Sequence, residues 1–146
     1  MKITEALLAE HIVFHNLFDH LEAAVPRLKT TAEVRALACL MEAVLRAHSD
    51  TEEKLVFAPL AHCLAQIGQT ESFEEEHQEI NHDLLEAQQA EKVAQARRLL
   101  LDAVVASRKH FDKEERLVFP LAEKWLKAKT LTDLGQTWME QRKAAG

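Results

Sequence analysis

Two segments of this 146-residue chain place histidine and glutamate at a spacing suited to metal binding. Residues 48–57 read HSDTEEKLVF and residues 110–119 read HFDKEERLVF, so seven of the ten positions are identical. On an α-helix, residues at i and i+4 lie on the same face, so an imidazole nitrogen and a carboxylate oxygen can be directed at one point. The two pairs are therefore candidate cation ligands: His48 with Glu52, and His110 with Glu114.

Two more histidines follow a glutamate in segments of similar type, because residues 10–14 read EHIVF and residues 76–80 read EHQEI. Around each of the four histidines, apolar residues recur in alternating steps of three and four, which is typical of a helix face directed at a bundle core. Their distances from the expected helix connections place the polar members of these stripes at one level. The six residues expected in this layer are His11, His48, Glu52, His77, His110 and Glu114.

A bound cation explains this layer better than isolated polar residues do. Any one of the six is most simply a side chain on a solvated face. Buried together without partners, they would cost several kcal/mol per ionised group, a large part of the roughly 5–15 kcal/mol that stabilises a small protein. Four imidazoles and two carboxylates predict a dinuclear centre, and mixed ligation of this kind suits iron, with Mn, Co or Zn as substitutes. His15 lies four residues after His11 and is predicted as a fifth imidazole ligand.

The other histidines and both cysteines are expected to take no part in the centre. His20 and His82 lie off the apolar stripes, and His62 falls in an expected turn. Cys39 and Cys63 lack C-x-x-C spacing, so we expect them to be small buried fillers with free thiols.

The composition predicts an all-α fold. Only three Gly and three Pro occur, too few for the turns of a β fold, and 47% of the residues are hydrophobic. We expect helices over about residues 4–26, 31–59, 70–90 and 91–120, with a capping box at residues 130–133 opening a short terminal helix. Pro59 is expected to bend or end the second helix and to leave a turn up to Gly68.

The repeated segments indicate a duplicated helix pair. Two repeated αα-hairpins around a pseudo-twofold axis predict an up-down four-helix bundle. The length predicts a single domain over residues 1–146, with the bundle at about 4–128 and a C-terminal helical appendage at about 130–143.

Charge and hydropathy exclude several partners. The net charge is −6 and no dense Lys/Arg run occurs, so we expect no nucleic-acid binding. No apolar stretch approaches the roughly 20 residues of a membrane span, and the N-terminus lacks the apolar region of a signal peptide. The chain is expected to be cytoplasmic, without a membrane partner.

Over roughly residues 5–128 the pattern resembles the hemerythrin-like or HHE cation-binding domains. The likeness rests on a helix-one histidine, H-x-x-x-E-E before an apolar residue, Phe and Pro, an E-H pair in the third helix, and a second H-x-x-x-E-E-x-L-V-F-P. It implies a four-helix bundle around a non-haem diiron site, oxo- or hydroxo-bridged, which meets O₂ or a related small molecule at an open iron position. By position, the implied ligands are His11, His48, Glu52, His77, His110 and Glu114.

The third helix departs from the oxygen-carrying hemerythrins, which have H-x-x-x-H there. In this chain Asn81 stands four residues after His77, and the H-x-x-x-H that includes a stripe residue is His11 with His15 on helix one. The fifth histidine is therefore expected in the other half of the pseudo-twofold arrangement.

The fourth helix also departs from those carriers, which close its motif as H-x-x-x-x-D. Here His110 is followed by Glu114 or Glu115 as the acidic ligand. We expect Glu115 and its counterpart Glu53 to point about 100° away from the stripe, at the surface or behind the ligands.

These departures leave three functions open. The first is a diiron protein that binds O₂ or a related small oxidant for sensing, storage or delivery. The second is a diiron oxidase, a peroxidase or a nitric-oxide-reacting enzyme. The third is an iron-handling or metal-free helical interaction module.

Overall fold

The computed structural model describes residues 1–145, so Gly146, the last residue of the predicted domain, lies outside the described residues. Within residues 1–145 the regular elements are all helical, which confirms the predicted all-α class. The α-helices are α1 (Ile3–Ala24), α2 (Thr31–Glu52), α3 (Ala58–Gln66), α4 (Thr70–Gln89), α5 (Val93–Lys113), α6 (Phe119–Trp125) and α7 (Ala128–Ala144).

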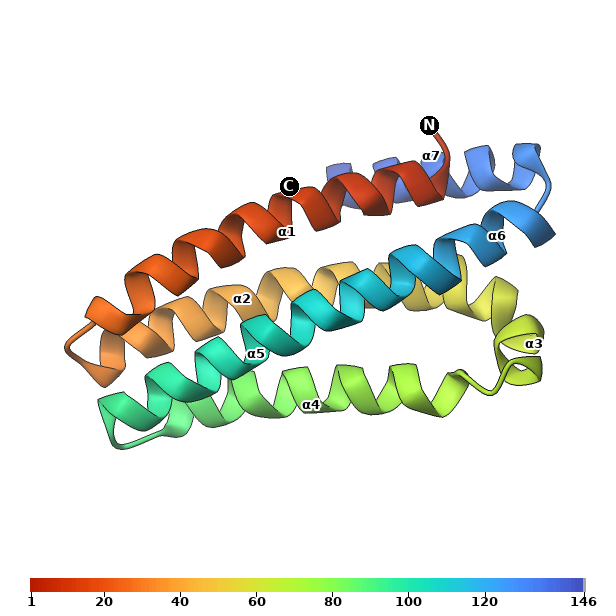
Figure 1. Ribbon diagram of the computed structural model, residues 1–146. Coiled ribbons are helices and arrows are strands. Elements are labelled where there is room, and N and C mark those ends of the chain that lie inside the picture. Colours follow the sequence, from red (N-terminus) through yellow and green to blue (C-terminus); the bar gives the residue numbers. More distant parts are fainter. Residues whose placement is uncertain (146) are drawn as a thin grey trace.

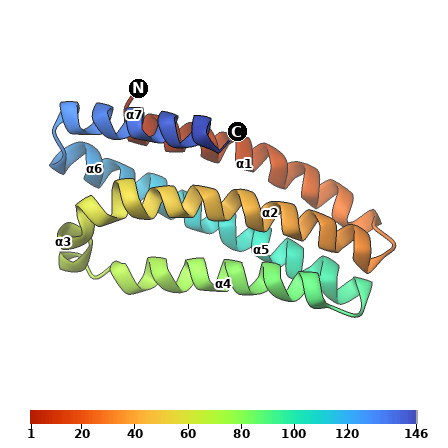
Figure 2. The same cartoon turned by 180° about the vertical axis from the view of Figure 1, so that it is seen from behind.

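The long helices α1, α2, α4 and α5 lie alongside one another and form a helical bundle (Figure 1). The short helix α3 connects α2 to α4 at one end of the bundle. The C-terminal helix α7 packs along the N-terminal part of α1, as both views show (Figure 2). Of the helices in the described residues, none is long and apolar enough to cross a membrane.

The connections follow local sequence signals. Thr30 caps α2 through a capping box, in which its hydroxyl accepts from the Glu33 N–H and the Glu33 carboxylate accepts from the Thr30 N–H. Between α3 and α4, Gly68 adopts φ +68°, a left-handed conformation that favours glycine over residues with a Cβ. Both turns change the direction of the chain between one helix and the next (Figure 1).

The apolar core has two parts, separated along the helices by the polar layer. One part includes Phe14, Leu45 and Ile80, and the other includes Leu7 and Leu55. In α1, in α4, and in α2 together with the turn that follows it, the histidine of the stripe lies between a residue of one part and a residue of the other. The core therefore encloses the polar layer instead of leaving it at an end of the bundle.

Each repeated segment contains a π-helical turn, which begins five residues after His48 in one copy and four residues after His110 in the other. These turns are η2 (Glu53–Phe57) and η3 (Glu114–Val118), closed by i to i+5 hydrogen bonds from Ala58 N–H to the Glu53 carbonyl and from Phe119 N–H to the Glu114 carbonyl. In each copy a proline then occupies the second position of the next helix. As expected, the chain bends here, since α3 turns away from the line of α2 (Figure 1), but the expected turn from Pro59 to Gly68 is wrong, because residues up to Gln66 are helical. A proline in the first turn has no intrahelical N–H bond to lose.

The wider π turn corrects another expectation. Ordinary α-helical spacing would place Leu117, three residues after Glu114, on the buried stripe, but it is 40% exposed while Val118 is fully buried. A π turn holds more residues than an α turn, so the inward position moves from the third residue to the fourth.

Two smaller expectations are also wrong. Helix α7 begins at Ala128, so the supposed capping box at residues 130–133 lies inside the helix; the hydroxyl of Thr132 donates to the carbonyl of Ala128. Cys39 is exposed and Cys63 is half-buried, so neither is a buried filler, although both are free thiols.

Candidate metal centre

The structure brings the six residues of the predicted layer into one cluster. Five of them are almost completely buried, at 0–2% exposure, and His77 is the exception. Metal-ligating atoms that lie within 4.8 Å of one another form two groups, and Glu52 and Glu114 belong to both. The first group is His11, His48, Glu52 and Glu114, and the second is Glu52, His77, His110 and Glu114.

In the first group the imidazoles face each other across a carboxylate. The Nε2 atoms of His11 and His48 are 3.1 Å apart. They lie 3.5 Å and 3.2 Å from Oε1 of Glu52. Nε2 of His11 is also 3.3 Å from Oε2 of Glu114. The nitrogen and oxygen atoms of three helical segments thus surround a common point.

The second group repeats this arrangement with His77 and His110. Their ring centroids are 4.4 Å apart. Oε1 of Glu114 lies 2.7 Å from Nε2 of His110 and 4.0 Å from Nε2 of His77. The two oxygens of Glu114 are therefore divided between the two groups, Oε2 facing His11 and Oε1 facing His110.

Most of these atoms have no hydrogen-bond partner despite their closeness. The unpartnered atoms are both carboxylate oxygens of Glu52 and of Glu114, and Nε2 of His77 and of His110. Their short contacts lack hydrogen-bond alignment because the atoms point at shared positions instead of at each other. Burying unpartnered polar atoms is costly, and a bound cation would satisfy them.

The carboxylates strongly change the basicity of the histidines. Burial lowers the pKa of His48, but the charge of Glu52 and a hydrogen bond to Glu10 outweigh it and raise that pKa to about 10. For His11, burial is likewise outweighed by Glu114 and Glu52, and the pKa rises to about 9. Without a metal, protons on these imidazoles balance the buried negative charge.

His77, the one partly exposed histidine of the cluster, behaves differently. Burial and the neighbouring charge of His110 lower the pKa of His77. Its side chain is 20% exposed and borders a pocket of about 190 Å³, whose walls include Phe57, Leu64 and Phe73. The cluster is thus reached from outside on the His77 side.

Glutamates behind the histidines fix the orientation of three rings. The Nδ1–H groups of His48 and His110 donate to Glu10 at 2.6 Å and to Glu76 at 2.7 Å. With Nδ1 occupied by a carboxylate, Nε2 is the nitrogen that faces the cluster. Sequence reasoning missed this role, although Glu10 and Glu76 are the glutamates of the two E-H pairs.

His11 is oriented by two contacts of its own. Its Nδ1–H donates to Glu115 at 2.9 Å, and its ring stacks on Phe111 with centroids 4.0 Å apart. Glu115 therefore lies behind the ligand set, whereas Glu114 lies inside it. At the equivalent position of the other repeat, Glu53 is exposed, so the two halves differ here.

The structure does not bring His15 into either group. Its Nδ1 accepts a hydrogen bond of 2.9 Å from Arg108 on α5. The same guanidinium also pairs with Asp19 and Glu22, at 2.6 Å and 3.0 Å. The side chain of His15 is thus directed to a charged network on the surface. The three histidines expected to be bystanders are exposed: His20, His62 and His82.

Comparison with known proteins agrees with this geometry. The sequence model of the hemerythrin HHE cation-binding domain matches residues 2–122. Neither the curated proteins nor the solved structures gave a significant match. The matched region contains all six residues of the cluster and ends before α7. Because the match covers most of the chain, this protein belongs to the hemerythrin HHE cation-binding domain family.

Proposed function

We propose that this protein holds two iron ions in the buried cluster and that they bind or react with O₂ or a related small oxidant. The observation that carries the proposal is the sharing of Glu52 and Glu114 by two donor groups, with all four carboxylate oxygens unpartnered. Two ions would use this set fully: one held by His11 and His48, the other by His77 and His110, with both glutamates between them.

The donor chemistry supports iron. Each group offers two imidazoles and two carboxylates, a mixed nitrogen and oxygen set that suits iron and also accepts Mn, Co or Zn. With four protein donors for each ion, positions on the metal would remain open. When bound and reduced, iron at such a position supplies electrons and a binding point for O₂.

The residues of the chain set which molecules reach the cluster. The pocket at His77 is small and its walls are largely apolar, which suits a neutral molecule of a few atoms. Apolar residues of both core parts pack around much of the rest of the cluster, although His48 and His110 each also line a further pocket. The outer glutamates hold the imidazole Nδ1 protons, which keeps three Nε2 atoms available to the metal.

A second candidate function is turnover of the oxidant, as in an oxidase, a peroxidase or a nitric-oxide-reacting enzyme. It is favoured by the number of imidazoles, because the described residues place only two in each donor group. Asn81 stands where the oxygen carriers have a further histidine, and its side chain is exposed. Fewer protein ligands leave more positions for an oxidant and its reducing partner.

We also propose that the two halves are repeated hairpins of an up-down four-helix bundle in one domain.

Metal analysis combined with optical spectroscopy tests this proposal. We expect two irons per chain after anaerobic loading with Fe²⁺, and new absorption bands on exposure to O₂. Bands that disappear under vacuum support binding, and irreversible oxidation with loss of added peroxide or nitric oxide supports turnover. A chain that takes up neither iron nor Mn, Co or Zn would leave the metal-free interaction module as the remaining function.

The outer carboxylates predict that the equivalent glutamates of the two repeats differ in their effect on metal affinity. We expect Glu115→Ala to weaken metal binding by about 10-fold to 100-fold, because His11 loses the partner that orients its ring. The matched control is Glu53→Ala at the equivalent position of the other repeat, where the side chain is exposed. Titration with Co²⁺ followed by visible absorption measures both. Equal affinities for the two variants would contradict this role of Glu115.

The raised histidine pKa values predict that metal binding releases protons. With pKa values of about 9 and about 10, His11 and His48 are protonated at pH 7 in the metal-free protein. An imidazole must lose its proton to bind a metal, so affinity should rise with pH toward about 9 and fall in acid. Calorimetric titration in two buffers of different ionisation enthalpy measures the release. Identical heats in both buffers would contradict it.

The raised pKa values of His11 and His48 also predict how the stability of the metal-free fold changes with pH. The protonated histidines contribute stability to the metal-free fold that is complete below the unfolded pKa of 6.5 and is lost as pH rises through about 9 to 10. We therefore expect the metal-free protein to lose stability over this range.

A further inference from the structure

The C-terminal helix α7 is docked closely on the start of α1. At Gly135 the two backbones approach so closely that an added Cβ would collide with the carbonyl oxygen of Met1. Four residues earlier, Leu131 is 1% exposed and packs in the same core part as Ile3 and Leu7. The position of α7 along α1 is thus determined by packing, although α7 lies outside residues 2–122 that match the family.

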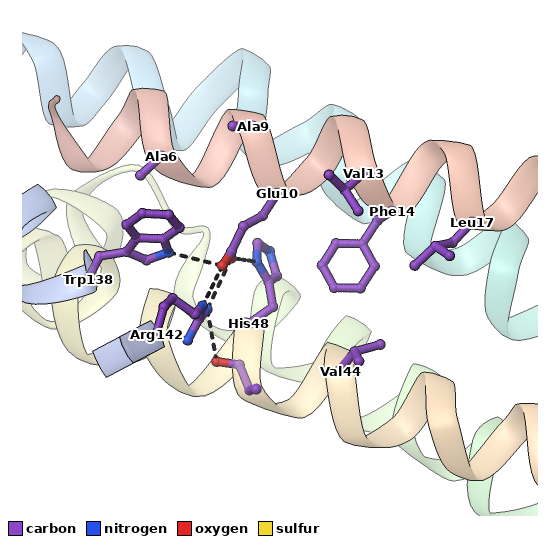
Figure 3. A pocket seen from close by; sticks show the side chains of 11 residues that line it. Ala6, Ala9, Glu10, Val13, Phe14, Leu17, Val44, His48, Trp138 and Arg142 are labelled. Atoms are coloured by element: carbon purple, nitrogen blue, oxygen red, sulfur yellow. Dashed lines mark hydrogen bonds and ion pairs between the residues drawn. The ribbon is translucent and has the colours of Figure 1, made fainter. Parts of the chain in front are cut away.

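Two side chains of α7, one helical turn apart, hold the carboxylate of Glu10 (Figure 3). Trp138 donates its Nε1–H to Oε1 at 3.0 Å. Arg142 donates from Nε to Oε1 at 2.6 Å and from Nη2 to Oε2 at 3.1 Å. Oε2 is also the atom that accepts from Nδ1 of His48. Glu10 is therefore fixed between α7 and a residue of the metal centre.

The guanidinium of Arg142 also contacts α2 on both sides of His48. Nη1 donates to the hydroxyl of Thr51 at 3.0 Å, and Nη2 lies 3.4 Å from the carbonyl of Ala47. One side chain thus links α7 to both helices of the first hairpin. Burial alone would raise the pKa of Glu10, but the hydrogen bonds from His48 and Arg142 lower it to about 2, so its negative charge persists at neutral pH.

The surroundings strengthen these bonds. A pocket of about 500 Å³ lies beside them, and its lining between α1 and α2 is mostly apolar, including Val13, Phe14, Leu17 and Val44 (Figure 3). Charge-assisted hydrogen bonds next to an apolar wall compete less with water and are stronger than the same bonds on an open surface.

The other half of the centre needs no such appendage. There Glu76 orients His110 and is itself held by Lys113 at 2.9 Å. Lys113 and His110 belong to the same helix, α5. Support for His110 therefore comes from α4 and α5. Support for His48 comes instead from α7, where Arg142 lies 132 residues after the Glu10 that it holds.

We propose that α7 is a positioning element of the metal centre. Trp138 and Arg142 hold Glu10, and Glu10 holds the ring of His48 with its Nε2 toward His11. The His11 and His48 half of the centre thus depends on the C-terminal helix, and the His77 and His110 half does not. This inference rests on the proposed metal-binding function.

The first test uses the metal-free protein, so that it does not depend on the proposed function. NMR of ¹⁵N-histidine-labelled chain reports the Nδ1 proton of His48, which should be protected from exchange by Glu10. We expect Arg142→Ala to lose this signal and to keep that of His110. Lys143→Ala is the matched control, because Lys143 is exposed on the same helix. An unchanged His48 signal in Arg142→Ala overturns the inference.

The second test uses Co²⁺ as the probe and counts both ions. We expect Arg142→Ala to bind one ion with wild-type affinity and the other about 10-fold or more weakly. Trp138→Phe removes only the N–H donor, keeps the packing, and decides the question if Arg142→Ala fails to fold. Wild-type affinity for both ions in both variants overturns the inference. If the wild type binds no metal, the proposed function fails, and the His48 signal alone decides the positioning role.

Discussion

Replacement of Glu114 by glutamine removes both metal ions from the centre, whereas replacement of His77 by alanine removes only one. Glu114 contributes an oxygen to each donor group, and His77 contributes to the second group alone. An amide cannot supply two anionic oxygens, so the variant loses the shared ligand and the charge that balances two cations. We expect the metal content to fall from two per chain to none.

Glu52→Gln should behave like Glu114→Gln, because Glu52 is the other shared carboxylate. Elemental analysis of each variant after loading and gel filtration gives the number of ions per chain. His62→Ala is the control, since His62 is exposed on α3 and should leave two ions in place. Retention of two ions by Glu114→Gln would show that the two groups are not linked through this residue.

Removal of the metal lowers the melting temperature by about 10 °C at neutral pH. A ligand that binds only the folded state at about 1,000 times its Kd contributes about 4 kcal/mol, and 1 kcal/mol corresponds to roughly 2–4 °C in a chain of this size. The physical source is the cluster itself, in which buried carboxylates of Glu52 and Glu114 lack hydrogen-bond partners until a cation is bound.

Differential scanning calorimetry of the loaded protein, with and without a chelator, measures this difference. The double variant Glu52→Gln and Glu114→Gln serves as the reference, because its melting temperature should not respond to added metal. A wild-type protein with the same melting temperature in both states would exclude tight metal binding to the folded chain.

The convergence of the six polar residues could be predicted because it depends on spacing within helices. The pairs His48 with Glu52 and His110 with Glu114 keep their i and i+4 relation in any helical packing. The exposure of His77 could not be predicted, because it depends on a pocket between η2, α3 and α4.

The outer contacts depend on neighbouring helices, which spacing does not reveal. Glu10 lies one residue before His11 but reaches His48 on α2, and it is held by Arg142 of α7. The expectation for His15 rested on its spacing from His11 alone. In the structure Arg108 of α5 faces His15, and a guanidinium on the neighbouring helix could not be placed from periodicity.

The π-helical turns have a consequence for how the motif can change in length. A π turn amounts to one residue inserted into an α-helix, and the proline that follows η3 stands one position earlier in its repeat than Pro59 does after η2. The π turn is displaced by the same one position as the proline. The two copies therefore accommodate this difference without disturbing Glu52 or Glu114. Deletion of Leu117 should restore an ordinary α-helix, in which Val118 stands three residues after Glu114 and still points into the core, so α6 should keep its orientation relative to the metal centre. Segments on either side of such a turn can thus vary independently, one keeping its ligands while the other adapts its packing.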